Sequence, residues 1–404
     1  MGNRYTILEI GTGYTSIPSK IGAATEIVVE ELAKAASIQG LDVYIFDIND
    51  KNRPENNFKI KEVFVPAFIA NTLDYKLGFT HKLKRLLYSI SLAFHLIRFI
   101  KKNRRYTLHF HNQYNFFFFY VLCSKKRMKN IKLFYTNHTY TWSRSWPEIE
   151  RLIAKKYFME SFSMKKANMV FVLNEMTTQN LVDHLGLPPG KVKLIPNGVN
   201  TKVYYKLPAG DKNVALLSKK LNLEGKKTII HVGVVCDRKN QLEIIKWLTP
   251  LFKQIPEIVF LFAGAIREME YYHNITEYCK IQNIEKNVIY LGELPPGKIL
   301  NEHYNLAIGF ILFSKSEGFS LALLEALSSG LPVLISKNLE IDFIKEKDNG
   351  ILFFEKQREL SDVFIKEVYA PERQIHHSEK AVQFIQRNYS WDKISNMYFG
   401  QLLS

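Results

Sequence analysis

The sequence predicts two α/β domains, each built on a doubly wound parallel sheet. The chain has 404 residues, which is more than one ordinary hydrophobic core accommodates. Apolar residues make up 47% of it, which is enough to fill two cores. Short β-rich apolar runs alternate with helical patterns in both halves, and this alternation is typical of repeated βα units and of parallel sheets.

The expected elements follow one another in a regular order. In the first half we expect strands at 5–10, 41–48, 106–112, 131–138, 167–174 and 192–199, with helices over 23–37, near 82–102 and near 114–124. A polar stretch rich in Gly and Lys interrupts the pattern up to about residue 227. In the second half we expect strands at 227–235, 258–266, 287–294, 306–313 and 331–336. A domain boundary near residues 200–205 explains the interruption.

The positive charge is concentrated in the first half. Residues 1–200 hold 29 Lys and Arg against 15 Asp and Glu, whereas residues 201–404 hold 26 against 24. This asymmetry indicates an anionic partner for the N-terminal domain, either a membrane surface or a nucleic acid. No nucleic-acid-binding motif accompanies the charge, so we expect no nucleic-acid partner.

A basic amphipathic stretch within residues 81–105 favours a membrane surface. Its apolar residues at helical spacing are Leu83, Leu86, Leu87, Ile90, Phe94 and Ile97, and its basic residues are Lys82, Lys84, Arg85, Lys101, Lys102, Arg104 and Arg105. The competing interpretation is that the apolar side packs on the sheet, as in any βαβ unit. The three cysteines lack metal-ligand spacing, and no run approaches the ~18 apolar residues of a membrane span. We therefore expect a cytoplasmic protein, peripheral on the inner face of the cell membrane if this stretch docks there.

The segment EGFSLALLE, residues 317–325, lies between two expected strands of the second domain. Ser320 can cap a helix, Gly330 can follow its C-terminus, and Pro332 prevents its continuation. Ligands of open parallel sheets bind at the carboxyl ends of strands, where Glu317 is expected.

The two carboxylates of this segment have two interpretations. Glu317 and Glu325 can accept hydrogen bonds from sugar hydroxyls, while Gly318 and the free N–H groups of the helix start suit a phosphate. A phosphorylated sugar fits both sets of groups. Alternatively, Glu317 is an ordinary exposed loop residue and Glu325 lies on a solvated helix face.

The segment SKSEGFSLALLEALSSGLPVLIS, with seven residues between Glu317 and Glu325, resembles the signature of family 4 retaining glycosyltransferases. The segments KVKLIPNGVN and YSWDKISNMYFGQLL are similar to the linker entry and the last helix of that family, so the resemblance covers most of the chain. It implies the GT-B fold, in which two Rossmann-like domains face a cleft. The expected domains are 1–202 on the acceptor side and 203–385 for the nucleotide sugar, with a helix at 386–404 that crosses back to the N-terminal domain.

The resemblance also implies roles for particular residues. Glu325 is expected to accept from the ribose hydroxyls, and Glu317 from the hydroxyls of the donor sugar. Arg238 and Lys239 are expected to stabilise the leaving diphosphate, and His138 to face the donor sugar. The remaining donor-binding residues carried over are Gly318, Phe319, Ser320 and, in the first domain, Gly22. His109 and His111 are expected to be structural.

The implied reaction is retaining transfer of a hexose-type sugar from a UDP- or GDP-sugar to a glycan or lipid-linked acceptor. No Asp-x-Asp pair or cluster with metal-ligand spacing is present in the sequence, so we expect no metal and no cofactor besides the donor. Val234 stands where many family members have an Arg after the strand's glycine. This departure leaves open a catalytically inactive, membrane-docked protein that binds sugar nucleotides.

Overall fold

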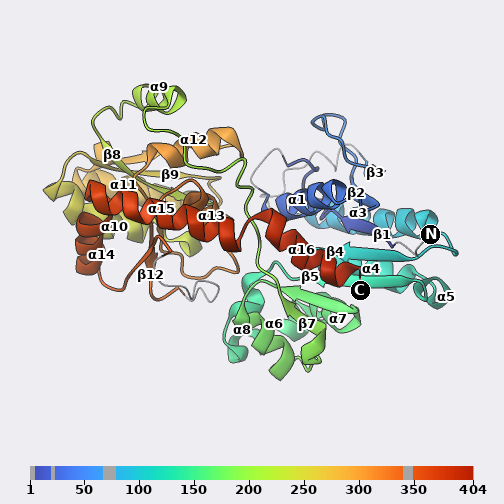
Figure 1. Cartoon of the computed structure of the whole chain (residues 1–404). Coiled ribbons are helices and arrows are strands. Elements are labelled where there is room, and N and C mark those ends of the chain that lie inside the picture. The colour runs from blue at the N-terminus through green and yellow to red at the C-terminus, as the bar shows by residue number, and fades with distance from the viewer. Residues whose placement is uncertain (1–4, 20–22, 67–78, 340–348, 404) are drawn as a thin grey trace. The chain divides into compact units, whose positions relative to one another are not determined.

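The computed structural model of the chain describes residues 5–19, 23–66, 79–339 and 349–403, which form two compact units (Figure 1). Unit 1 comprises Met1–Asn197 and Trp391–Ser404, and unit 2 comprises Gly198–Ser390. The sequence places these boundaries after residues 202 and 385. The structure differs because Val199 pairs with Ser390 in a parallel bridge, which assigns both connecting segments to unit 2.

Unit 1 contains a seven-stranded parallel sheet with the order β3-β2-β1-β4-β5-β6-β7. Its strands are β1 (Thr6–Ile10), β2 (Val43–Ile48), β3 (Ile60–Val63), β4 (Tyr106–Phe110), β5 (Ile131–Thr136), β6 (Met169–Val172) and β7 (Val192–Leu194). The chain winds outward from β1 in one direction and from β4 in the other. The switch point between β1 and β4 is the place where such sheets bind ligands, at the carboxyl ends of the strands.

Two hydrophobic cores cover the two faces of this sheet, because successive side chains of a strand point to opposite sides. Leu8 of β1 packs in the core beneath α3 and α4, whereas Ile7 packs in the core beneath α1 and α16. The helices of unit 1 are α1 (Ala24–Ile38), α3 (Phe79–Phe99), α4 (Gln113–Leu122), α5 (Lys125–Met128), α6 (Trp146–Lys155), α7 (Phe158–Lys166), α8 (Glu175–Gln179) and α16 (Trp391–Leu402). The last helix of the described chain thus completes the core of the first domain.

Unit 2 contains a six-stranded parallel sheet with the order β10-β9-β8-β11-β12-β13. Its strands are β8 (Lys227–Val232), β9 (Ile258–Ala263), β10 (Val288–Tyr290), β11 (Gly309–Leu312), β12 (Val333–Ser336) and β13 (Ile351–Phe354). Its helices are α9 (Lys212–Lys220), α10 (Gln241–Gln254), α11 (Met269–Gln282), α12 (Lys298–Leu306), α13 (Leu321–Ser328), α14 (Gln357–Val363) and α15 (Pro371–Asn388). The switch point lies between β8 and β11.

Both faces of this second sheet are also covered. Ile230 and Phe310 pack in a core with α12, α13 and α15, while Ile229 and Phe260 pack in a core with α10, α11 and α14. The predicted fold class, two doubly wound parallel sheets, is therefore confirmed. The structure adds two strands that the sequence did not predict, β3 and β13, each at an edge of its sheet. None of the helices in the described ranges is long and apolar enough to cross a membrane.

Candidate functional site

The candidate site of unit 2 is built by the loops that follow the neighbouring strands β8 and β11. The first loop contains a short 3-10 helix, η4 (Asp237–Lys239), and backbone hydrogen bonds tie it to the second: the Lys315 N–H donates to the Arg238 carbonyl at 2.9 Å. The Arg238 guanidinium donates in turn to the Ser316 carbonyl, also at 2.9 Å. Arg238, Lys239 and Glu317 are thereby brought together at the switch point.

Glu317 is the centre of this charge cluster. Its carboxylate accepts from the Lys239 ammonium at 2.6 Å and from the Arg238 guanidinium at 3.4 Å. Burial opposes ionisation of Glu317, but the two cations outweigh it and lower the pKa of this carboxyl. The predicted sugar-binding carboxylate is therefore held by the predicted phosphate-binding cations.

Glu325 lies on α13 with 9% of its surface exposed, which excludes the solvated helix face considered above. The Tyr304 hydroxyl donates to its carboxylate at 3.0 Å. Burial is the largest influence on this group and raises its pKa to about 7, although hydrogen bonds from Tyr304 and Tyr204 act in the opposite direction. The two tyrosines are the partners that a buried carboxylate needs, and sequence reasoning missed both.

The start of α13 has the predicted form. The Ser320 hydroxyl caps the helix by accepting from the Leu323 N–H at 3.3 Å, and Gly330 follows its end with a φ of +79°. Gly318 and Phe319 lie in the connecting loop, and the Phe319 side chain packs partly buried against the core beneath α13. The N–H groups of this helix therefore start directly after the loop that carries Glu317.

The candidate site of unit 1 is a buried row of histidines at its switch point. His138 is the second residue after the end of β5 and is partly exposed, and its Nε2 lies 2.9 Å from Nδ1 of His111. His111 and His109 are buried and both lie beside the carboxylate of Glu9 on the neighbouring strand. The expected structural character of His109 and His111 agrees with their burial, but sequence reasoning missed their contact with Glu9 and with His138.

Glu9, His109 and His111 are also close enough to hold a metal ion, since one ligand atom from each lies within 4.8 Å of the others. The sequence gives no sign of this proximity, because the pairing of β1 with β4 brings Glu9 beside two histidines that are far from it along the chain. Direct hydrogen bonds connect the three side chains at 3.0–3.2 Å. These bonds account for the cluster, and we assign no metal to it.

Two further residues singled out in the sequence, Gly22 and Val234, are not part of the clusters described above. Gly22 lies outside the described residues. Val234 follows Gly233 at the end of β8 and is partly exposed, while Arg238 lies four residues further on and contacts Glu317. A cation is therefore present beside Glu317 although the position after the glycine is apolar.

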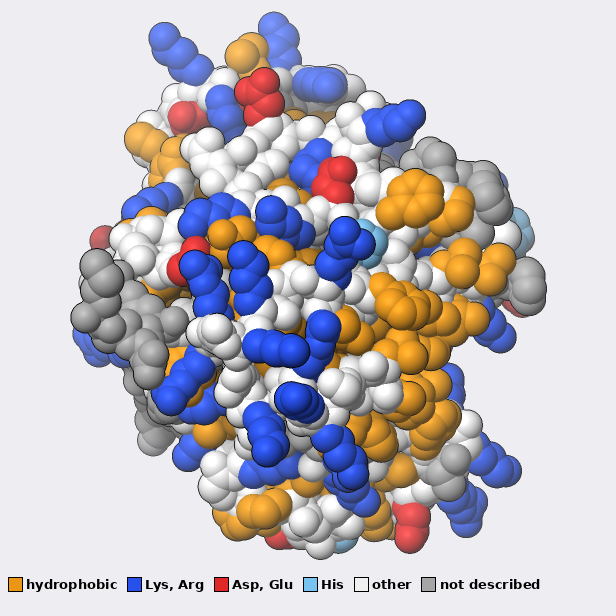
Figure 2. Space-filling model, turned by 90° about the vertical axis from the view of Figure 1, so that its right-hand side faces the viewer, with side chains coloured by type: hydrophobic (Ala, Val, Ile, Leu, Met, Phe, Trp, Pro, Cys, Tyr) orange, Lys and Arg blue, Asp and Glu red, His pale blue; other side chains and the backbone are white. Residues whose placement is uncertain are grey.

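Basic residues of unit 1 lie on α3, α5 and α7, and Figure 2 shows hydrophobic side chains in a band beside a dense group of Lys and Arg. The expected docking stretch is only partly exposed: Leu83, Leu87 and Ile97 pack against the core, and Lys84 is buried with its ammonium donating to the Tyr14 carbonyl at 2.9 Å. The prediction that these four residues belong to the docking face is therefore wrong, because their side of the helix must cover the sheet. The exposed large apolar residues on these helices include Leu86 and Phe94 of α3, Val121 and Leu122 of α4, and Phe158 of α7.

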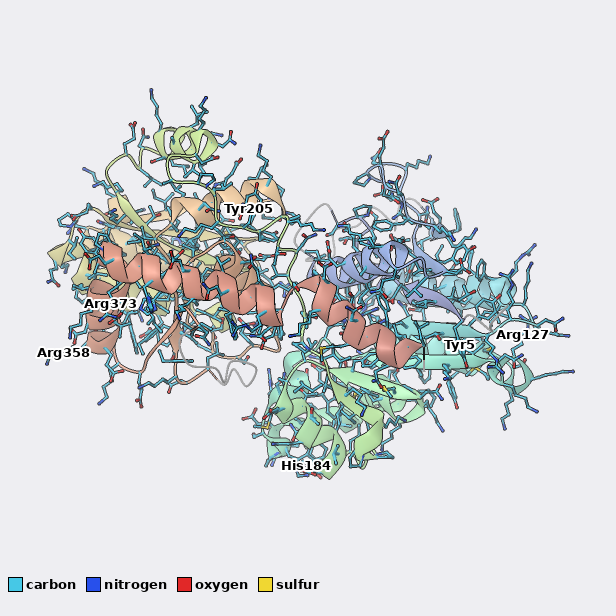
Figure 3. The ribbon with its side chains drawn as sticks, viewed as in Figure 1. Tyr5, Arg127, His184, Tyr205, Arg358 and Arg373 are labelled. Atoms are coloured by element: carbon cyan, nitrogen blue, oxygen red, sulfur yellow. The ribbon has the colours of Figure 1, made fainter. Side chains whose placement is uncertain are left out.

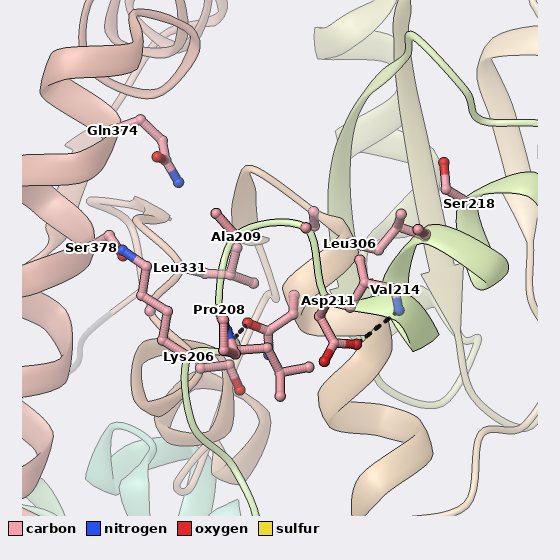
Figure 4. Close-up of a pocket in the computed structure, with 17 residues that line it drawn as sticks. Lys206, Pro208, Ala209, Asp211, Val214, Ser218, Leu306, Leu331, Gln374 and Ser378 are labelled. Atoms are coloured by element: carbon pink, nitrogen blue, oxygen red, sulfur yellow. Dashed lines mark hydrogen bonds between the residues drawn. The ribbon is translucent and has the colours of Figure 1, made fainter.

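A separate pocket of about 350 Å³ lies in unit 2 between the loop 206–211, α9 and α15 (Figure 4). Leu306, Ala307 and Leu331 line it, and these residues precede β11 and β12. The pocket therefore lies at the amino edge of the sheet, opposite to the edge that carries Glu317. We do not assign the donor to it.

Comparison with known proteins identifies the family. The pattern of Glycosyltransferase Family 4 matches residues 25–203, and that of Glycosyl transferases group 1 matches residues 214–391. With two Rossmann-like units and ligand edges at both switch points, the molecule is a glycosyltransferase of the GT-B type. The chain belongs to family 4, group 1 of these enzymes, as its sequence predicts.

Among similar proteins is alpha-galactosylglucosyldiacylglycerol synthase of Streptococcus pneumoniae, 30% identical over 54% of this chain and 57% of that protein. Alpha-monoglucosyldiacylglycerol synthase of Acholeplasma laidlawii is 23% identical over 85% of this chain and 84% of that protein. The solved structure of Anabaena HepE in complex with UDP and glucose superposes with a TM-score of 0.73, at 13% identity, over 99% of this chain and all of that one. The chain thus spans little more than half of the first relative and most of the other two proteins.

Proposed function

We propose that the protein transfers a hexose-type sugar from a UDP- or GDP-sugar to a lipid-linked or glycan acceptor, with retention at the anomeric carbon and without a metal ion. The cluster of Glu317, Lys239 and Arg238 at the switch point of unit 2 carries the proposal. It places two cations and a carboxylate beside the start of α13, where a nucleoside diphosphate sugar needs both kinds of group.

The roles of the residues follow from their surroundings. A bound diphosphate competes with Glu317 for Lys239 and Arg238, because both are anionic. Once the cations turn to the phosphates, the Glu317 carboxylate is free to accept from hydroxyls of the donor sugar. Glu325 accepts from the ribose hydroxyls in its ionised form, with Tyr304 fixing the orientation of its carboxylate.

UDP is the favoured nucleotide, and a diacylglycerol-type lipid is the favoured acceptor. Support for the first comes from the similar fold of HepE, which was solved with UDP and glucose. Support for the second comes from the two relatives that are named as glycolipid synthases. The acceptor class also agrees with the exposed apolar and basic surface of unit 1.

We propose in addition that this surface docks peripherally on anionic lipid at the inner face of the cell membrane. Residues 101–166 hold 15 Lys and Arg against 3 Asp and Glu, and of these acidic residues Glu160 is buried. Lys125 and Lys126 of α5 are exposed, whereas Arg127 of the same helix, labelled in Figure 3, is partly buried and donates to the Ile97 carbonyl. Exposed apolar side chains of α3, α4 and α7 lie on the same surface, so hydrophobic insertion and electrostatic attraction can act together.

A panel of UDP- and GDP-sugars tests the reaction. We expect one donor to raise the thermal unfolding temperature and to be consumed when diacylglycerol is supplied in mixed micelles, with EDTA present and with an α-configured product detected by NMR. Donor binding without transfer or hydrolysis would favour the inactive sugar-nucleotide-binding protein that Val234 leaves open. Absence of any nucleotide effect would overturn the proposed function.

A further inference from the structure

A continuous row of hydrogen-bonded side chains leads from the interior of unit 1 to His138. The Glu9 carboxylate lies 3.1 Å from Nε2 of His111, and Nδ1 of His111 lies 2.9 Å from Nε2 of His138. The rings of His111 and His138 stack, with centroids 5.2 Å apart and planes inclined by 27°. Glu9 and His111 are buried, whereas His138 is partly exposed at the ligand edge of the sheet.

The chemistry of these groups fixes the direction of each hydrogen bond. An ionised carboxylate only accepts, so Nε2 of His111 must carry the proton that it shares with Glu9. In a neutral His111 the other nitrogen, Nδ1, is then an acceptor, and the N–H of the contact must come from Nε2 of His138. Neutral His138 is left with an unprotonated Nδ1, and this atom makes no hydrogen bond with the part of the chain that the structure describes.

The charges of the row agree with this assignment. Burial opposes ionisation of Glu9, but its interactions with His109 and His111 outweigh burial and lower the pKa of this carboxyl to about 2. Burial and the proximity of His109 lower the pKa of His111 to about 4. Burial and the neighbouring His111 also hold the pKa of His138 well below its usual value. Near neutral pH, Glu9 is therefore ionised while His111 and His138 are neutral.

The other branch of the row ends inside the protein. His109 pairs with Glu9 across β4 and β1, and its Nε2 lies 2.7 Å from the Thr136 hydroxyl. Its ring packs against Tyr398 of α16 and Phe171 of β6. His109 shares the strand, the face and the burial of His111 but does not contact His138 in this row, which makes it a matched control.

We propose that Glu9 and His111 are positioning residues that hold His138 in its neutral, Nε2-protonated form, so that Nδ1 offers a lone pair to a hydroxyl group of the substrate. A neutral imidazole accepts a hydrogen bond at its unprotonated nitrogen, and unlike the charged form it does not repel a cation. The hydroxyl belongs to the donor sugar or to an acceptor alcohol, and this part of the inference rests on the proposed function. The hydrogen-bond row itself does not depend on it.

The test is a long-range ¹H–¹⁵N spectrum of the full chain labelled with ¹⁵N-histidine, in which the two ring nitrogens report the protonated position. The His138 signal is identified by its loss in His138→Gln. We expect the Nε2-protonated pattern in the native protein, unchanged from pH 6 to 8. The opposite tautomer, or a charged His138 at pH 7.5, would overturn the proposal, and so would a stoichiometric metal ion in the purified protein.

Two phenylalanine variants separate positioning from mere packing. His111→Phe keeps a ring on the same strand but removes the contact with His138, so we expect mixed His138 tautomers and a fall in kcat/KM of ~10-fold or more. His109→Phe removes one hydrogen bond to Glu9 but keeps the contacts from Glu9 to His111 and from His111 to His138, so we expect the native His138 pattern. Equal disturbance by both variants, or a native pattern in His111→Phe, would overturn the role of His111. The spectra give this answer even if the chain proves to have no transferase activity.

Discussion

The Lys239 ammonium lies 2.6 Å from a carboxylate oxygen of Glu317, and both side chains are about nine-tenths buried, at 12% and 9% exposure. An ion pair this well shielded differs from the nearby pair of Lys315 and Asp237, which spans a similar distance but is more than half exposed. The Glu317 carboxylate thus holds the Lys239 ammonium at the position where we propose that the diphosphate binds. Removing either partner of a buried pair leaves an uncompensated charge.

Lys239→Ala is therefore expected to lower the free energy of unfolding of unit 2 by ~3 kcal/mol and turnover by ~10²-fold or more. Arg238 remains beside Glu317, but its contact is longer at 3.4 Å. Lys315→Ala is the control, and its exposed pair should contribute no more than ~1 kcal/mol. Urea unfolding and steady-state transfer assays measure both variants. Similar losses of stability in the two variants would contradict the distinction between the pairs.

Glu317→Ala should separate nucleotide binding from transfer. Loss of the carboxylate frees Lys239 and Arg238 for a diphosphate, so we expect the affinity for free UDP to be kept or increased. Transfer should fall, since the hydroxyls of the donor sugar lose their acceptor. Calorimetric titration with UDP beside transfer assays tests this, and a variant that no longer binds UDP would show that Glu317 contacts the nucleotide instead.

Glu325→Gln should remove a pH dependence of stability. The pKa of Glu325 rises from 4.5 to about 7 on folding. Its contribution to stability is therefore complete below pH 4.5 and is lost as the pH rises through 7, a change of ~3 kcal/mol. The amide oxygen of Gln can still accept from Tyr304. Urea midpoints at pH 5 and pH 8 should thus differ less in Glu325→Gln than in the native protein or in a control, Glu224→Gln, at an exposed site. Equal pH dependence in all three would contradict the raised pKa.

Gly264→Ala should be strongly destabilising because two strand ends meet at this residue. Gly264 follows β9 with a φ of +140°, and a Cβ at this position would lie 2.1 Å from the Gly233 carbonyl oxygen. Gly233 in turn begins the loop that carries Arg238 and Lys239. Gly190→Ala, where a Cβ meets nothing within 4 Å, is the control. Thermal unfolding should distinguish the two, with a loss of at least ~2 kcal/mol only in Gly264→Ala.

Replacing Lys125, Lys126 and Lys129 by Gln should weaken binding to anionic vesicles by ~100-fold, because each lysine near such a surface contributes ~1 kcal/mol. Replacing Lys219, Lys220 and Lys226 of unit 2 removes the same charge from exposed positions elsewhere. Flotation with phosphatidylglycerol vesicles, and with neutral vesicles alongside, measures the difference. An equal effect of both triple variants would show that vesicle binding depends on net charge and not on the surface over α5.

The sequence was most informative where the relevant residues are neighbours along the chain. Glu317, Ser320 and the start of α13 lie within a few residues, and the cap of this helix forms as predicted. The partners of Glu325 were not predictable in the same way, because Tyr304 is 21 residues away and its contact depends on how α12 packs beside α13. Packing of one helix on another leaves no local pattern in the sequence.

The same reason explains the histidine row. Alternation along β4 shows that His109 and His111 share a face, but only the strand order places Glu9 beside them. The unpredicted strands β3 and β13 have a different cause. Both lie at sheet edges, and in β3 two consecutive exposed charged residues, Lys61 and Glu62, precede the buried Val63, so no continuous apolar run marks it.

The return of α16 to unit 1 has a consequence for biosynthesis. Ile394, Tyr398 and Leu402 are fully buried in the core that they share with α1, yet they are made after all of unit 2. During translation, the described core residues of unit 2 have all left the ribosome before the last core residues of unit 1 emerge. Until residues 391–402 emerge, α1 covers this face of the sheet without α16. A nascent chain halted before residue 391 thus still exposes part of the core of unit 1 to chaperones.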